Sequence, residues 1–140
     1  MAVLDWMQFS DAQTSTSSTV FNSTNTLDTE ATDSNLGAGT PIWLVTRVNT
    51  AFAGTSGTYI VKLQHCATSG GTYLDLLVSA TYTTTQLVKG FDLMTVPLPV
   101  EHQRYLKLTY TQATGTGYPT GKIDAFLTTQ APRNTGAWGT

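Results

Sequence analysis

The sequence has few charged residues and a single cysteine, and each shortage excludes some classes of protein. Charged residues make up 11% of the 140 residues, well below the share of about a quarter that is usual in globular domains. The single cysteine, Cys66, has no partner for an intrachain disulfide, so packing must hold the fold together. No apolar run approaches the roughly 18 residues that a membrane-spanning helix needs, and no membrane partner is expected.

Basic residues are also few, which argues against electrostatic binding of nucleic acid. Seven Lys and Arg stand against nine Asp and Glu, for a net charge of -2 and a pI near 5.4. No base precedes Arg47, so the basic start of a secretory signal is missing and we expect synthesis in a cytoplasm. The acidic first 40 residues are expected either to lie on a basic body, their own or a neighbour's, or to stay solvated.

Threonine is the abundant residue, with 28 copies or one fifth of the chain. Its branched side chain is stiff and suits a pleated sheet better than a helical turn. No segment sustains the apolar spacing of an amphipathic helix. The composition therefore predicts an all-β protein of one domain.

Alternating apolar residues predict where the strands lie. In the clearest case, Leu106, Leu108 and Tyr110 face one way and their neighbours the other. Strands are expected over residues 41–49, 59–66, 73–79, 91–98, 104–111 and 122–128, with weaker ones at 19–27 and 81–85. The first of these is apolar on both faces and should be central, whereas Pro97 and Pro99 suit an edge strand or the end of a strand. This spacing of short strands is typical of an antiparallel β-sandwich or barrel. The chain divides into an extended N-terminal arm at 1–15, a body at 16–128 and an extended C-terminal tail at 129–140.

Residues that carry catalysis or bind metals do not form a recognisable constellation. His65 and Cys66 are adjacent on an expected strand, so their side chains should point to opposite faces. His102 stands alone in a loop, too far from His65 in the sequence for a zinc signature. We expect no catalytic residues, no metal site and no cofactor.

Aromatic residues near the two ends are better candidates, because they make large contacts at small entropic cost. Trp6 and Phe9 either contact a partner or fasten the N-terminal segment to its own sheet. Trp138 lies in a glycine-rich tail, where a lone domain has little use for a tryptophan. The candidate contacts with a partner protein or with another subunit are Trp6, Phe9, Asp11, Tyr105, Arg133 and Trp138.

An ordered series of segments carries a resemblance to a known family. The segments are FSDAQ at 9–13, STNTLD at 23–28, LGAGTPIWLV at 36–45, FAG at 52–54, VKLQ at 61–64, VPLP at 96–99 and RYLKLTY at 104–110. In this order they resemble the capsid cement, or decoration, proteins of tailed bacteriophages, of the type found in a Bordetella phage. The resemblance covers about residues 5–128 and leaves out the C-terminal tail.

The resemblance implies a jelly-roll sandwich that binds the outer surface of an icosahedral phage head as a homodimer or homotrimer. Its partner there would be the major capsid protein, whose neighbouring subunits it would bridge without catalysing any reaction. The alternative is a carbohydrate-binding sandwich of a tail fibre or head decoration, with Tyr105 and Trp138 stacking on sugars. Jelly rolls host many functions, so the fold alone does not decide between the two.

Overall fold

Strands make up most of the computed structural model, which describes residues 7–16, 18–30, 39–54, 57–114 and 119–129. The elements are β1 (Gln8–Thr14), β2 (Val20–Asn22), β3 (Leu27–Asp28), β4 (Trp43–Ala53), β5 (Gly57–Cys66), β6 (Leu74–Val78), β7 (Tyr82–Thr83), the 3-10 turn η2 (Thr84–Gln86), β8 (Asp92–Pro97), β9 (Tyr105–Thr114) and β10 (Thr120–Thr128). Among these residues, no helix has the length and apolarity needed to cross a bilayer.

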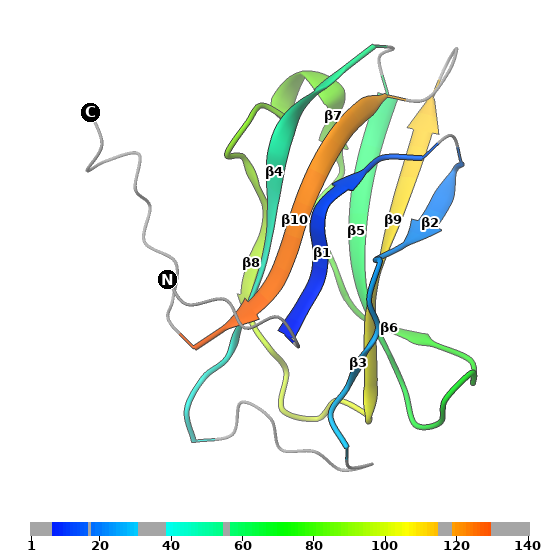
Figure 1. Ribbon diagram of the computed structural model, residues 1–140, viewed down its shortest axis with the longest axis vertical. Coiled ribbons are helices and arrows are strands. Elements are labelled where there is room, and N and C mark those ends of the chain that lie inside the picture. The colour runs from blue at the N-terminus through cyan, green and yellow to red at the C-terminus, as the bar shows by residue number, and fades with distance from the viewer. Residues whose placement is uncertain (1–6, 17, 31–38, 55–56, 115–118, 130–140) are drawn as a thin grey trace.

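The strands form two antiparallel sheets that pack face to face (Figure 1). Sheet A has the order β1-β10-β4-β8, and sheet B has the order β2-β9-β5-β6, with β3 also paired to β9 and β7 to β5. The pairs are nested: β1 with β10, β2 and β3 with β9, β4 with β8, and β5 with β6 and β7. Nested pairing of this kind is a long hairpin wrapped into two sheets, which is the jelly roll. The predicted sandwich is confirmed.

The core lies between the sheets and is built by alternate residues of each strand. Tyr59, Val61 and Leu63 of β5 are fully buried, and their neighbours Lys62 and Gln64 face outward. The same alternation buries the inward residues of β9 and β10, as the sequence predicts. Each large apolar side chain that is buried in this way contributes about 1.5–3 kcal/mol.

Strand β4 is central, as its two apolar faces predict. It pairs with β10 on one side and with β8 on the other. Leu44 and Val45 point to opposite faces, and both are completely buried. Both placements that the prolines suit are found, because β8 ends the order of sheet A and Pro97 is the last residue of that strand.

The N-terminal arm predicted at 1–15 needs correction. Residues 8–14 are strand β1, which pairs with β10 at the edge of sheet A, and Phe9 is completely buried in the core. Phe9 is therefore a core residue, so the alternative that it fastens the N-terminal segment to its own sheet holds, and its proposed surface contact was wrong. Two register shifts in β1 break the apolar alternation, which is why the strand is hard to see in the sequence.

The two weaker strand predictions differ in outcome. Residues 19–27 contribute the short strands β2 and β3, both paired with β9. Residues 81–85 form a strand only at Tyr82–Thr83, after which the chain turns into η2. There Gln86 accepts a hydrogen bond from the backbone N–H of Thr83 at 2.9 Å, which favours the turn over further strand.

A buried glutamine holds the connection through which the chain passes from sheet A to sheet B. Gln112 of β9 is completely buried. Its side-chain oxygen accepts a hydrogen bond from the Ser15 hydroxyl at 2.8 Å, and its amide nitrogen donates to the carbonyls of Thr16 and Ser18. All its hydrogen-bonding groups are thus engaged, and the β1–β2 connection is tied to sheet B.

Candidate interaction surfaces

The adjacent residues His65 and Cys66 do not form a reactive thiol–imidazole pair. His65 lies beside Leu106 on the core side of the sheet, and its Nδ1 accepts a hydrogen bond from the Gln103 backbone N–H at 3.2 Å. The thiol of Cys66 instead donates to the carbonyl of Thr68 at 3.2 Å. The two neighbours thus use different partners, as adjacent strand residues should.

Tertiary structure does bring the two histidines near each other. Burial lowers the pKa of His65 below its ordinary value of 6.5, and the neighbouring His102 lowers it further. His102 is itself buried. Among the described residues, however, no group of three or more His, Cys, Asp or Glu is placed to hold a metal ion.

The outer face of sheet B carries a polar network that crosses four strands. Lys62 and Gln64 of β5 both reach Asp75 of β6, with contacts of 2.8 and 2.7 Å to its two carboxylate oxygens. Gln64 then accepts a hydrogen bond from Thr109 of β9 at 2.8 Å, and Thr109 lies 3.2 Å from the side-chain oxygen of Asn22. Hydrogen bonds from Gln64 and Lys62 lower the pKa of Asp75. The network fixes these side chains across the face.

Tyr105, a predicted contact residue, is partly exposed at one end of this face. The Arg104 guanidinium lies 5.1 Å from the centre of its ring and makes two hydrogen bonds to Asp28, at 2.6 and 2.8 Å. These hydrogen bonds lower the pKa of Asp28 to about 2. Nearby, the Lys107 amine lies 4.2 Å from the centre of the Tyr73 ring. A cation therefore already stands against each of these two tyrosine rings.

The other predicted contact residues are not gathered at one place. Asp11 is exposed on β1, at the edge of sheet A, and thus on the other sheet from Tyr105. Trp6, Arg133 and Trp138 lie outside the described residues. The structure therefore defines no common surface for the six residues that the sequence singled out.

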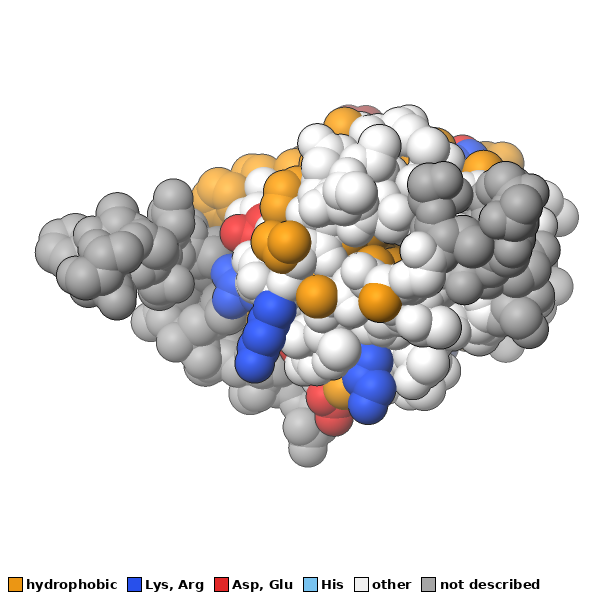
Figure 2. Space-filling view, turned by 90° about the horizontal axis from the view of Figure 1, so that it is seen from above, with side chains coloured by type: hydrophobic (Ala, Val, Ile, Leu, Met, Phe, Trp, Pro, Cys, Tyr) orange, Lys and Arg blue, Asp and Glu red, His pale blue; other side chains and the backbone are white. Residues whose placement is uncertain are grey.

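The end of the sandwich shown in Figure 2 carries no large surface of one kind on its described part. Its hydrophobic side chains are scattered among polar ones, and the Lys and Arg side chains stand apart from one another. A broad basic surface is the usual footprint of a nucleic-acid-binding face. The described part of this end lacks that pattern.

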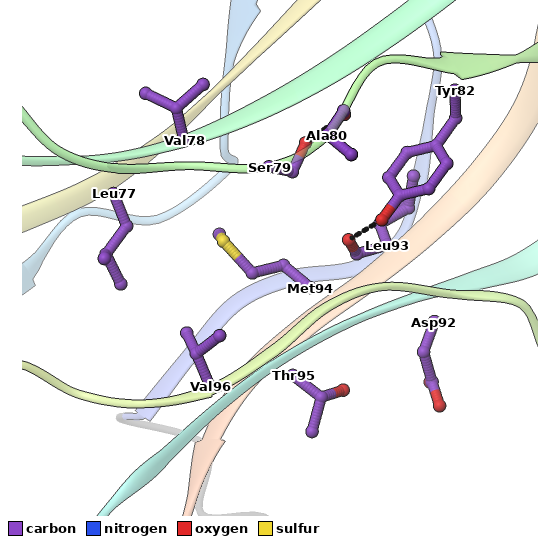
Figure 3. A pocket seen from close by; sticks show the side chains of 10 residues that line it. All are labelled: Leu77, Val78, Ser79, Ala80, Tyr82, Asp92, Leu93, Met94, Thr95 and Val96. Carbon is purple, nitrogen blue, oxygen red and sulfur yellow. Dashed lines mark hydrogen bonds between the residues drawn. The ribbon is translucent and has the colours of Figure 1, made fainter.

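An apolar groove, which the sequence did not predict, opens where the free edges of the two sheets face each other (Figure 3). Its volume is about 400 Å³. The lining residues are Leu77, Val78, Ser79, Ala80 and Tyr82 from the β6–β7 side, and Asp92, Leu93, Met94, Thr95 and Val96 from β8. The groove joins segments of different sheets, so no local pattern in the sequence marks it.

One hydrogen bond closes part of this groove. The hydroxyl of Tyr82 donates to the carbonyl of Leu93 at 2.9 Å, which ties the edge of sheet B to the edge of sheet A (Figure 3). The Tyr82 ring also packs edge-on against Phe91, with 5.1 Å between ring centres. Further along, Val78 and Leu74 of β6 remain 54% and 57% exposed. Such an exposed apolar edge is typical of a docking surface.

A comparison with known protein families gives a match over most of the chain. A family model described as Bbp16 matches residues 9–127. The matched range begins inside β1 and ends inside β10, so it spans the whole sandwich. The match is consistent with a Bordetella-phage protein. No curated protein matches the chain.

Proposed function

Because the chain belongs to the Bbp16 family, we propose that it is a capsid cement protein of a tailed bacteriophage. In this proposal it binds the outer surface of the icosahedral head, bridges neighbouring subunits of the major capsid protein and acts as a small homo-oligomer. It carries no catalytic activity and needs no cofactor. The observation that carries the proposal is the family match across the entire jelly roll, which agrees with the ordered segments that resemble phage cement proteins.

The surface of the fold supports a binding role. Strand β6 exposes Leu74 and Val78 at the edge of sheet B, and it contains no lysine or arginine that would discourage pairing with another chain. On the other side of sheet B, the network around Asp75 holds polar side chains in fixed positions. A rigid body with one apolar edge and one ordered polar face is suited to repeated docking on a lattice.

The stabilising mechanism is mass action. A ligand that binds the assembled shell and not its separated subunits shifts the equilibrium toward the assembled shell. A protein that contacts two capsid subunits at once also makes the second contact intramolecular, with an effective concentration in the millimolar range (~1 mM). Modest individual contacts therefore add up to a strong reinforcement of the head.

The carbohydrate-binding alternative receives less support from the same surface. Sugar recognition by stacking needs a free aromatic face, and the rings of Tyr105 and Tyr73 each have a cation against them. The polar residues beside them are also engaged with one another.

The test is to compare phage heads assembled with and without the protein. Heads that lack it should break open at a lower temperature, and adding the purified chain should restore the higher threshold. A cryo-EM map should then show its density over the whole shell. Equal thresholds would refute the cement role, and density confined to the tail, with binding on a glycan array, would favour sugar recognition.

A further inference from the structure

The groove between β6 and β8 lacks a filling side chain among the described residues. Its lining is mainly apolar, with Leu77, Met94 and Val96 directed toward it from the two sheets (Figure 3). The volume of about 400 Å³ is enough for one large aromatic side chain and its backbone. Filling it would remove apolar surface from water, which is favourable.

Strand β8 also has hydrogen-bonding capacity to offer. Because β4 is its partner in sheet A and β8 ends that sheet, alternate backbone groups of β8 face away from the sheet. An extended segment placed along β8 would supply partners for these groups.

We propose that the C-terminal segment of the same chain, residues 130–140, docks in this groove and places the Trp138 ring against Met94 and Leu77. The register of sheet A puts the start of the segment nearby. Thr128, at the end of β10, pairs with Trp43, and Trp43 pairs with Pro97 of β8. Thr128 is therefore two strand spacings, about 10 Å, from the β8 edge.

The length of the segment allows this docking. Trp138 is ten positions after Thr128, and an extended chain of ten residues spans up to about 33 Å. That reach covers the distance across β4 and β8 and leaves enough chain to turn into the groove. A tryptophan suits the site because its indole packs well against a methionine sulfur and its N–H needs one acceptor, which a free β8 carbonyl provides.

The opposite end of the chain does not fit the site. Strand β1 is three strand spacings from β8, about 14 Å, and Trp6 is two residues before Gln8, a reach of about 7 Å. The groove of a second copy would be within reach of either end. The tether nevertheless favours docking within one chain, because a short linker holds the tail at an effective concentration of about 1 mM beside its own groove.

Disulfide trapping tests the proposal. In a Cys66→Ser background, Trp138→Cys is combined either with Ala80→Cys in the groove or with Ala51→Cys on β4. Both alanines are exposed. Ala51 is eight residues from Trp43 along β4, about 27 Å, and so lies within the reach of the tail but outside the groove. Dilute protein is oxidised, and the products are separated without reductant and identified by mass spectrometry.

We expect a disulfide within single chains for the Ala80 variant, at a yield that does not depend on protein concentration, and little for the Ala51 variant. Equal yields at both positions would mean that the tail has no preferred site and would overturn the proposal. Disulfides formed only between chains would assign the groove to a second copy and would overturn it as well.

Peptide binding gives a second measurement that needs no cysteine. A labelled peptide of residues 129–140 should bind a chain that ends at Thr129 at least about tenfold more tightly than the full chain, whose own tail competes. Replacing the tryptophan of the peptide by alanine should abolish the difference. Equal affinity for the two chains, or no binding to the shortened one, would contradict the proposal. The inference concerns the isolated chain and does not depend on the cement function.

Discussion

The hydroxyl groups of Ser10 and Tyr110 lie 2.8 Å apart in the core and connect the two sheets. Ser10 belongs to β1 of sheet A and Tyr110 to β9 of sheet B, and both are completely buried. Ser10 gives its only proton to the side-chain oxygen of Gln13. The Tyr110 hydroxyl must therefore donate to Ser10, so the three groups form a directed chain.

Because Tyr110 donates to Ser10, removing either hydroxyl should lower the free energy of unfolding by a different amount. Ser10→Ala leaves the buried Tyr110 hydroxyl without its acceptor, which should lower the free energy of unfolding by about 1–3 kcal/mol. Tyr110→Phe removes the donor but leaves Ser10 bonded to Gln13, and should cost about 1 kcal/mol. Urea unfolding of both variants and of the double variant measures the coupling. Strictly additive costs would show that the hydroxyl pair contributes nothing as a pair.

Gly121 of β10 lies against the Phe52 ring, which leaves no room for a side chain at this position. A Cβ atom at Gly121 would lie 2.4 Å from Cδ2 of Phe52 and 2.6 Å from its Cγ. Gly121→Ala should therefore lower stability by about 1–3 kcal/mol, because the ring must move within a packed core. The melting temperature of the variant measures the effect.

The matched control for the Gly121→Ala variant replaces the Phe52 ring by a smaller side chain. In a Phe52→Ala background the same Gly121→Ala change should cost much less, because the space it needs is already open. If the cost is the same in both backgrounds, the clash with the ring is not its cause.

The partly buried His65 predicts how stability depends on pH. Burial, with a smaller effect from His102, lowers the pKa of His65 below 6.5 in the folded chain. The unfolded chain therefore takes up its proton first as the pH falls, so stability present at neutral pH should decline below about pH 6.5. Chemical unfolding at pH 7.5 and at successively lower pH values measures this decline.

Two comparisons separate the contribution of His65 to the pH dependence of stability from that of other groups. His65→Gln should flatten the decline below pH 6.5, and an unchanged slope would assign it to other groups. Asp28 titrates elsewhere: its pKa of about 2 against an ordinary 3.8 means that the contribution of its Arg104 ion pair is lost only as the pH falls below about 4.

Truncation at the N-terminus separates the role of the end from that of the sheet. Removing residues 1–6 leaves β1 whole, so the β-rich circular dichroism should persist while capsid occupancy falls if Trp6 is a contact. Removing residues 1–14 also takes out the buried Phe9 and Ser10 and should abolish folding. Full occupancy with the shorter truncation would show that the N-terminal end is not an anchor.

Local patterns were enough to locate most of the strands. The alternation of Leu106, Leu108 and Tyr110 predicted β9 and the face it buries, and the structure confirms both. The doubly apolar segment around Leu44 predicted a central strand. These predictions succeed because successive side chains of a strand point to opposite faces, so the alternation of apolar and polar residues shows which face is buried.

The same reasoning failed where the repeat is interrupted or where separate segments meet. The sequence left open whether Phe9 contacts a partner or fastens the N-terminal segment to its own sheet, because two register shifts disturb the alternation of β1. The groove was not predicted because Leu77 and Met94 belong to strands of different sheets. Among the candidate contact residues, the structure separates Asp11 from Tyr105, although the sequence grouped them.

By itself, then, the sequence determined the class of the fold: threonine, alternating apolar residues and the lack of helical spacing leave a pleated sheet as the way to bury the apolar side chains. Tertiary structure alone decided which edges remain free, what hollow they enclose and which buried hydroxyls meet across the core. These features depend on contacts between residues far apart in the chain, and such contacts exist only once the hairpin has wrapped into two sheets.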